Sequence, residues 1–269
     1  MMPKVIDPYA GAGGLSLGAA RAGFEVAAAV ENDQYAIETH RKNFPATKHS
    51  PENIAFLKGH DLLELAGLRK GELTGLIGGP PCQGFSEMGK RKAEDERNRL
   101  LFHFFRLVEE TQPHFFLAEN VPGILNEQYK DLRNEAFGLL GKRYELLKPL
   151  TIVASDYGAP TTRTRIFFIG YDPEYFPDLN AGSFKPAGKI EPIHVEAALR
   201  GLIEEIDEEW LTEESGWQPV KSPGEGCYAE RTTGKIPKEV GDPVSIERYS
   251  VRKQVSGCLG TRHSGVRSL

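Results

Sequence analysis

The stretch DPYAGAGGLSLG, residues 7–18, decides the fold of this 269-residue chain. It begins at the end of a strand-like segment at 4–7, and it leads into a predicted helix at 15–22. Glycines in this place let the backbone turn tightly and let a ligand approach the first turn of the helix. Glu31 ends a second predicted strand, 26–31, where a carboxylate can meet ribose hydroxyls. The stretch predicts a nucleotide-type site, with a glycine-rich structural turn as the alternative.

The class of nucleotide follows from one departure in this stretch. Ser16 stands where the third glycine of the dinucleotide fingerprint GxGxxG is expected, so the pattern favours an adenosine-bearing cofactor other than NAD. Further along, Asp61 could accept a hydrogen bond from an adenine amino group. Its alternative role is an N-cap for a short helix at 62–65.

Strand and helix signals alternate through the first two thirds of the chain. Strand-like runs lie at 73–77, 115–119, 145–154 and 165–171, and helical runs lie at 34–43, 100–110 and 132–140. This alternation predicts an α/β fold with a mainly parallel sheet and helices on both faces. After about residue 178 apolar runs become rare and only 195–206 has a helical pattern, so a domain boundary is expected there.

A second stretch, GGPPCQGFS at residues 78–86, places Cys82 directly after two prolines. Prolines fix their own φ and restrict the residue before them, so Cys82 should lie on a stiff turn after the strand at 73–77. A thiol presented in this way can act as a nucleophile. The alternative is the usual one for a free cysteine, a small buried hydrophobe.

Three further side chains are expected near Cys82. Glu119 closes the strand at 115–119, so its carboxylate should open into the crevice at the carboxyl ends of the strands. In TTRTR, residues 161–165, period-two alternation places Arg163 and Arg165 on one side. The structural alternatives are an ion pair of Glu119 with an arginine and a surface edge for the arginines.

Composition limits the functional classes. With 33 basic and 38 acidic residues the net charge is −5, which is unusual for a nucleic-acid-binding protein, although basic residues cluster at 90–99 and 248–269. A solvated face is the alternative explanation for each cluster. Three distant cysteines fit neither a disulfide framework nor a zinc site. Without a run of about 18 apolar residues or a signal-peptide pattern, a cytoplasmic enzyme is expected.

Taken together and in order, these motifs resemble the bacterial type of the DNA cytosine-5 methyltransferase family. The matching segments are DPYAGAGG (motif I), GGPPCQGFS (motif IV), NRLLFHFFRLVEE (motif V), ENV (motif VI) and YGAPTTRTRIFFIG (motif VIII), with Glu31 in motif II and Asp61 in motif III. The resemblance implies a Rossmann-like S-adenosylmethionine-dependent methyltransferase domain over 1–178. It also implies a linker and an incomplete target-recognition region over 179–269.

The same resemblance implies a reaction, the transfer of a methyl group from S-adenosylmethionine to C5 of a cytosine in double-stranded DNA. Cys82 would add to C6 of the base, Glu119 would hold N3 and the amino edge, and Arg165 would bind O2 with Arg163 in support. The base would have to be flipped out of the duplex. S-adenosylhomocysteine would be the product, and no metal is implied.

The resemblance also assigns the binding residues. Those implied for the cofactor are Asp7, Tyr9, Ala10, Gly11, Gly13, Gly14, Glu31, Asn32, Asp61, Leu62, Pro80 and Leu100. Those implied for DNA are Pro80, Gln83, Ser86, Lys90, Arg91 and Arg97. Tyr9 would stack on the adenine, Pro80 would contact the exocyclic amine of the target base, and the loop 83–99 would close over the DNA with its basic residues on phosphates.

Two features depart from the family pattern. Thr161 stands where the family usually has Gln. Motifs IX and X are not identified in 179–269, so the sequence could belong to a truncated chain, to one half of a split enzyme completed by a second chain, or to a chain with missing segments.

Three functions therefore stay open. The first is DNA methylation in restriction–modification, where a cognate endonuclease could be a partner, or in epigenetic marking. The second is methylation of cytosine-5 in RNA, such as tRNA. The third is a catalytically incomplete DNA-binding partner of another chain. The bacterial cytoplasm or nucleoid is the expected location.

Overall fold

A computed structural model describes residues 2–81, 99–184, 191 and 193–194 of the chain. The strands are β1 (Lys4–Asp7), β2 (Glu25–Val30), β3 (Lys48–Ser50), β4 (Gly75–Gly78), β5 (Phe115–Asn120), β6 (Glu145–Leu146), β7 (Leu150–Val153) and β8 (Thr164–Tyr171). The α-helices are α1 (Gly14–Arg21), α2 (Gln34–Asn43), α3 (Gly59–Leu65), α4 (Arg99–Thr111) and α5 (Lys130–Phe137). Short 3-10 helices are η2 (Pro122–Leu125), η3 (Glu127–Tyr129), η4 (Ala154–Tyr157) and η5 (Ala181–Phe184).

The strands form an eight-stranded sheet in the order β3-β2-β1-β4-β5-β8-β6, and β7 pairs with β8 beside this path. Pairing is parallel from β3 through β2, β1 and β4 to β5, whereas β8 runs antiparallel to β5 and β6. The predicted mainly parallel sheet is therefore confirmed. The strand order changes direction between β1 and β4, which is the kind of switch point where α/β folds bind ligands.

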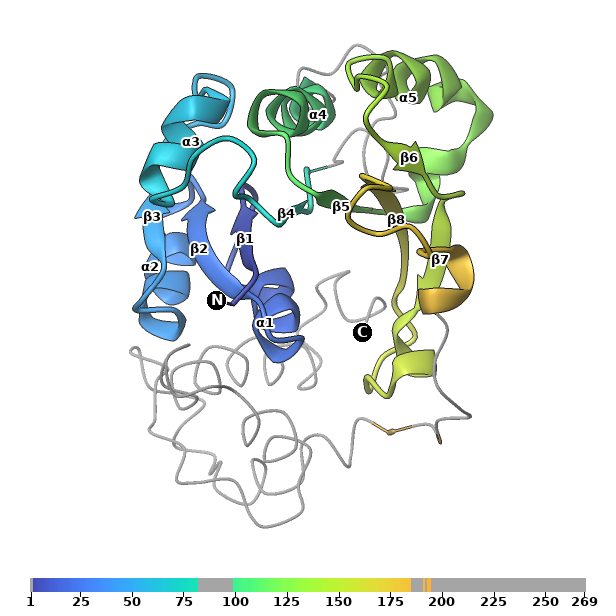
Figure 1. The fold of residues 1–269 in the computed structure, drawn as a ribbon. Coiled ribbons are helices and arrows are strands. Elements are labelled where there is room, and N and C mark those ends of the chain that lie inside the picture. Colours follow the sequence, from blue (N-terminus) through green and yellow to red (C-terminus); the bar gives the residue numbers. More distant parts are fainter. Residues whose placement is uncertain (1, 82–98, 185–190, 192, 195–269) are drawn as a thin grey trace, which may run out of the picture. The chain divides into compact units, whose positions relative to one another are not determined.

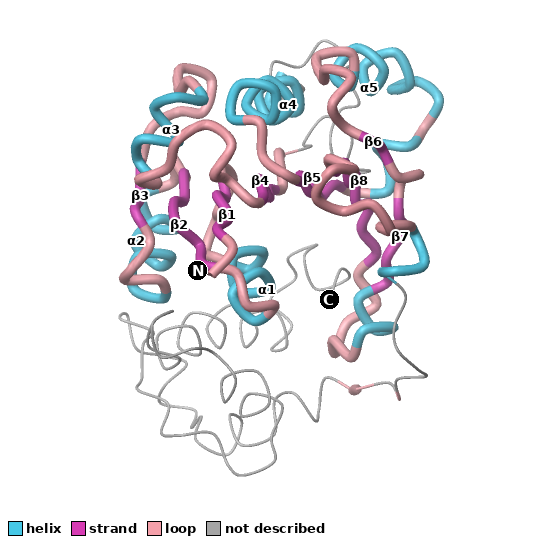
Figure 2. Tube along the Cα trace, viewed as in Figure 1, coloured by secondary structure: helices cyan, strands magenta, loops and turns pink. Residues whose placement is uncertain are grey.

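Helices cover both faces of this sheet. α3, α4 and α5 lie along one face, and α1 and α2 lie along the other (Figure 1, Figure 2). α4 carries Leu101, Phe104, Phe105 and Val108 at helical spacing, and all four are buried. Phe105 meets Phe116 of β5 edge to face, with ring centroids 5.5 Å apart. This aromatic packing fixes α4 on the sheet.

Most predicted elements are present, and β1 and α2 have the predicted bounds. The ends of the other predicted elements are shifted by up to three residues, and three differences affect the fold or the site. β3 has only three residues and was not predicted, α3 begins before the predicted helix at 62–65, and the extended run at 145–154 is divided into β6 and β7. Pro149, which lacks a backbone N–H, lies between these two strands. The predicted helix at 195–206 lies outside the described residues.

The chain divides into two compact units. The first, Met1–Arg41, Ala46–Ile152 and Thr164–Lys185, contains the sheet, and the second includes Lys42–Pro45 and Val153–Arg163. The boundary predicted at residue 178 stays a prediction. Among the helices in the described ranges, none has the length and apolar character needed to cross a lipid bilayer.

Candidate active site

The carboxyl ends of neighbouring strands bring the predicted site residues to one edge of the sheet. Asp7 ends β1, Gly78 ends β4, and Asn120 ends β5, directly after Glu119. These three strands are parallel neighbours, and Glu31 follows β2 beside them. The loops that carry the predicted chemistry therefore leave the sheet on the same side.

The backbone of the glycine-rich loop adopts conformations that residues with side chains rarely adopt. Gly11 has φ +52° and Gly13 has φ +106°, in the left-handed region that favours glycine. A Cβ atom added at Gly11 or Gly14 would meet nothing within 4 Å, so open space lies over the loop and over the start of α1. This geometry fits the close approach of a nucleotide.

Glu31 ties this loop to the end of β2. Its Oε2 accepts a hydrogen bond from the Gly11 backbone N–H at 2.9 Å, and its Oε1 accepts one from the Asp33 N–H at 2.8 Å. A carboxylate oxygen has a second lone pair, so Glu31 can still accept hydrogen bonds from ribose hydroxyls. Asn32, between these two acidic residues, is exposed.

Asp7 supports the loop from below. Its side chain is fully buried; Oδ2 accepts a hydrogen bond from the Ser16 hydroxyl at 2.7 Å, and Oδ1 accepts the Tyr9 N–H at 3.3 Å. Burial raises the pKa of Asp7 from 3.8 to about 7, and the hydrogen bond from Ser16 opposes that rise. The complete burial of Asp7 indicates an indirect role, and direct contact with a cofactor stays a prediction.

Tyr9 lies between the loop and α4. Its hydroxyl donates to the Leu100 backbone oxygen at 2.6 Å, so these two predicted cofactor residues are in contact. Its ring contacts Phe104, with centroids 6.4 Å apart. A Cβ atom at Gly78 would stand 3.2 Å from Tyr9 Cδ2, so the ring lies directly against the end of β4. Burial raises the pKa of the Tyr9 phenol.

Glu119 and Arg165 form an ion pair across β5 and β8. Arg165 Nε lies 2.6 Å from Glu119 Oε1, and their side chains are 19% and 29% exposed. On the other side of the carboxylate, a Cβ atom at Gly79 would stand 3.1 Å from Glu119 Oε2. Gly79 is three residues before Cys82 in the sequence. The structural alternative for Glu119, pairing with an arginine, is thus present, and the pair lies beside the segment that leads to Cys82.

Other predicted site residues are placed differently or not at all. Arg163 precedes β8 and belongs to the second unit, so its expected place beside Arg165 stays a prediction. Ala10 and Pro80 are buried. The site residues outside the described part of the chain are Cys82, Gln83, Ser86, Lys90, Arg91 and Arg97.

The alternative role that the sequence left open for Asp61, the N-cap of a helix at 62–65, is wrong, because α3 begins at Gly59 and its N-cap is Lys58. Asp61 lies in the first turn of α3, where its Oδ2 accepts the Lys58 N–H at 3.1 Å in a capping box. Leu62 is fully buried in the core. Neither residue follows β3 directly, and their contact with a cofactor stays a prediction.

Sequence reasoning gave no role to Asn53, which the structure places after β3. Because β3 was not predicted, the segment after it received no role. The end of β3 lies beside Glu31, whose N–H donates to the Ser50 oxygen at 3.1 Å, and exposed Asn53 follows three residues later. The short KHSPEN segment between α2 and α3 is the signal that could have identified it, because an α/β alternation requires a strand there.

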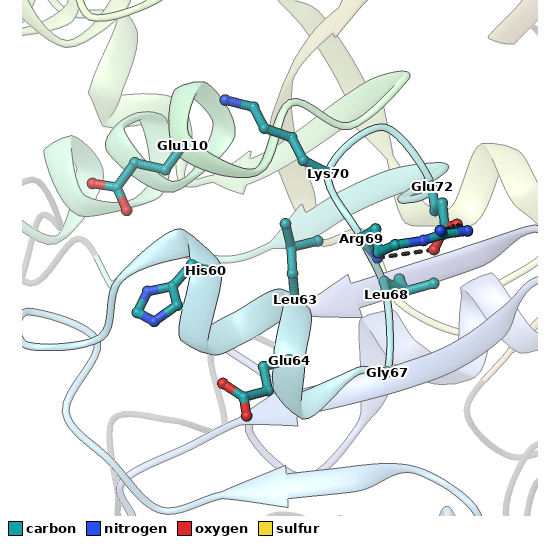
Figure 3. A pocket seen from close by; sticks show the side chains of 9 residues that line it. All are labelled: His60, Leu63, Glu64, Gly67, Leu68, Arg69, Lys70, Glu72 and Glu110. Atoms are coloured by element: carbon teal, nitrogen blue, oxygen red, sulfur yellow. Dashed lines mark hydrogen bonds and ion pairs between the residues drawn. The ribbon is translucent and has the colours of Figure 1, made fainter.

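A pocket elsewhere in the first unit contains none of the predicted site residues (Figure 3). Its lining consists of His60, Leu63, Glu64, Gly67, Leu68, Arg69, Lys70, Glu72 and Glu110. Arg69 and Glu72 form an ion pair with each other at 2.6 Å. Within the described ranges, no group of three or more His, Cys, Asp or Glu side chains could hold a metal ion.

Comparison with known proteins identifies relatives. A solved structure described as a DNA modification methyltransferase encoded within a prophage (E. coli) is 47% identical, with a TM-score of 0.76; the match covers 92% of this chain and 69% of that chain. The type II methyltransferase M.XorII of Xanthomonas oryzae pv. oryzae is 38% identical over 62% of this chain and 40% of its own length. M.DdeI of Desulfomicrobium norvegicum, also a type II methyltransferase, is 36% identical over 83% of this chain and 50% of its own length.

The family follows from a longer match. This chain spans about half the length of the curated relatives just described. A family model described as C-5 cytosine-specific DNA methylase matches residues 3–237, which is most of the chain. The motif order, the sheet and the solved relative agree with this match. The chain therefore belongs to the C-5 cytosine-specific DNA methylase family.

Proposed function

We propose that the protein methylates C5 of cytosine in double-stranded DNA with S-adenosylmethionine as the methyl donor. Family membership supports the reaction class. The observation that carries the proposal for this chain is the Glu119–Arg165 ion pair beside Gly79, three residues before Cys82. A carboxylate, a guanidinium and a thiol are the groups that addition to a pyrimidine ring requires.

The polar and aromatic groups at the edge of the sheet fit S-adenosylmethionine. Glu31 would accept hydrogen bonds from the ribose hydroxyls, Tyr9 would contact the adenine, and the open space over Gly11 and Gly14 would admit the methionine part. We assign the adenine amino group to Asn53 as an alternative to Asp61, because Asn53 follows β3 beside Glu31. When bound, S-adenosylmethionine supplies an electrophilic methyl group attached to a sulfonium.

The residues of the chain would make C5 a nucleophile. The Cys82 thiolate adds to C6, a C–S bond forms, and the electron pair of the C5–C6 double bond becomes available at C5. Glu119 holds the N3 and amino edge and favours protonation there, and Arg165 binds O2. After C5 has been methylated, a base removes the C5 proton, the double bond re-forms, and Cys82 leaves as a thiolate.

The Glu119–Arg165 pair gives the carboxylate a defined orientation. Oε1 is held by Arg165, and Oε2 lies on the side of Gly79, towards the segment that leads to Cys82. We therefore assign contact with the flipped base to Oε2. Lys90, Arg91 and Arg97 would contact the phosphates around the flipped nucleotide.

The proposal is tested by transfer of tritiated methyl groups from S-adenosylmethionine to DNA. Wild-type protein and the control Cys227→Ser should transfer methyl groups, and Cys82→Ser should not. An oligonucleotide with 5-fluorocytosine should become covalently attached at Cys82, because fluorine cannot leave as a proton does. Transfer that is unaffected by Cys82→Ser would contradict the mechanism. Transfer to tRNA in preference to DNA would favour the RNA alternative.

The length of the relatives suggests one further experiment. Because the chain spans about half of their length, a second chain could complete the activity. Co-expression with a segment carrying motifs IX and X tests this, and Cys82-dependent transfer only in its presence would support a two-chain enzyme. No Cys82-dependent transfer under either condition would favour a non-catalytic DNA-binding role. A cognate endonuclease is a proposed partner because the relatives are named type II methyltransferases.

A further inference from the structure

A line of four hydrogen-bonded side chains runs from the glycine-rich loop to β3. Ser16 Oγ lies 2.7 Å from Asp7 Oδ2, His40 Nε2 lies 3.0 Å from Ser16 Oγ, and His49 Nε2 lies 2.8 Å from His40 Nδ1. These residues come from β1, α1, α2 and β3. The line therefore connects the loop to two elements that contribute no residue to the predicted catalytic groups.

Burial decides the charge of the two imidazoles. Asp7, Ser16 and His40 are fully buried, and His49 is half-buried. Burial lowers the pKa of His40 to about 3 and that of His49 to about 4, and the proximity of His49 adds to the effect on His40. At neutral pH both rings are uncharged, so each has one donor and one acceptor nitrogen.

With Asp7 ionised, the hydrogen bond that Ser16 donates to it sets the arrangement of protons that we assign to the line. The Ser16 hydroxyl donates to Asp7, so its oxygen must accept from His40 Nε2–H. His40 Nδ1 is then the acceptor, and His49 Nε2–H donates to it. Every donor in the line points towards the Asp7 carboxylate.

Asp7 in turn holds the loop. Its second oxygen accepts the Tyr9 N–H, and two residues further on Glu31 accepts the Gly11 N–H. The loop backbone is thus held by two carboxylates, one at each side of Ala10. Glu31 follows β2 and Asp7 is the last residue of β1, and the Asp7 carboxylate is oriented by Ser16 and, through Ser16, by the histidines.

We propose that His40 and His49 are positioning residues for the cofactor-binding loop, acting through Ser16 and Asp7. This inference rests on the proposed use of S-adenosylmethionine. Neither histidine touches the cofactor; their contribution is to orient the Asp7 carboxylate that fixes the backbone at Tyr9.

Binding of S-adenosylhomocysteine to the full chain, measured by calorimetry, tests this proposal. We expect Ser16→Ala and His40→Leu each to weaken binding about tenfold, because each leaves a buried hydrogen-bonding group without its partner. DNA affinity should change less than twofold. The control His114→Gln, at the amino end of β5, should leave both affinities unchanged.

The double variant separates positioning through Ser16 from an independent structural role. If His40 acts through Ser16, the double variant should bind S-adenosylhomocysteine about as well as either single variant. If the two effects multiply, so that the double variant binds S-adenosylhomocysteine close to a hundredfold more weakly than wild type, the inference is overturned. His49→Gln, whose amide can still donate, should bind better than His49→Leu, and equal affinities would count against His49.

The proton arrangement can be measured on the wild-type protein, so this test does not depend on whether a variant folds. At pH 8, above the pKa of Asp7, nitrogen NMR of the wild-type protein should show His40 neutral with its proton on Nε2. A proton on Nδ1 would overturn the proposed direction. The proposed function fails separately, when wild-type protein does not bind S-adenosylhomocysteine at all. If wild-type protein binds S-adenosylhomocysteine and the His40 and Ser16 variants bind it with the same affinity, only this inference is overturned.

Discussion

Gly79 is a residue where the backbone closely approaches the Glu119 carboxylate. In Gly79→Ala the added Cβ would stand 3.1 Å from Glu119 Oε2, closer than ordinary contact, so the carboxylate must move. We expect methyl transfer to fall about tenfold or more, because small displacements of catalytic groups have large effects on rate.

The matched control for this substitution is Gly18→Ala in α1. A Cβ atom at Gly18 meets nothing within 4 Å, and alanine favours the helix by about 0.5–1 kcal/mol, so activity should be kept and the melting temperature should not fall. Methyl-transfer rates and thermal melts of both variants give the comparison. Full activity in Gly79→Ala would show that Glu119 does not need its present position.

Asp7 predicts a pH dependence of stability. Its pKa of about 7 in the folded protein is above the value of 3.8 expected for the unfolded chain, so the folded state binds the proton more tightly. The free energy of unfolding should therefore lose a contribution on the order of 4 kcal/mol as pH rises from about 4 to about 7.

Asp7→Asn removes this titration and keeps a side-chain oxygen for Ser16. Urea unfolding at several pH values should show that wild-type protein loses stability relative to Asp7→Asn between pH 4 and 7. The two histidines titrate in both proteins, so their opposite effect cancels in the difference. If the difference in free energy of unfolding between the two proteins stays constant across this range, the pKa of Asp7 is not raised.

At the scale of elements, the attachment of α4 decides whether Leu100 can reach Tyr9. Phe105 contacts Phe104, Phe116 and Phe137 edge to face and is fully buried. We expect Phe105→Ala to lower the free energy of unfolding by about 3–5 kcal/mol. Leu139→Ala, at a side chain that is 41% exposed, should change it by less than about 1 kcal/mol. Urea denaturation of both variants measures the difference, and equal losses would contradict the assigned core.

The elements also show what sequence patterns can predict. The bounds of β1 and α2 were predicted correctly because the periodicity of apolar residues is local information. β3 was missed because its three residues, KHS, include no apolar side chain. Ser16 was interpreted only as a missing glycine, since its bond to Asp7 depends on the packing of α1 against β1. The Glu119–Arg165 pair required the antiparallel pairing of β5 with β8, which no local pattern specifies.

For the whole molecule, a net charge of −5 means that the proposed DNA binding would depend on local basic residues. If Arg91 contacts a phosphate, Arg91→Ala should weaken binding to any DNA sequence and reduce the slope of log K against log salt by about 1. Lys70→Ala, in the pocket of Figure 3, is the charge-matched control and should leave the slope unchanged. Equal slopes for wild type and Arg91→Ala would remove Arg91 from the proposed DNA contact.

The pairing of β1 with β4 has a consequence for how the protein reaches its native state. The Lys4 backbone N–H bonds to the Thr74 hydroxyl across 70 positions of sequence, and Val5 is in register with Gly75. Such a large loop must close before the central strands gain their mutual contacts, and non-local pairings of this kind slow folding. During synthesis, β1 cannot pair with the whole of β4 until residue 78 has left the ribosome. We expect refolding to take milliseconds to seconds, with a transient state that chaperones can recognise.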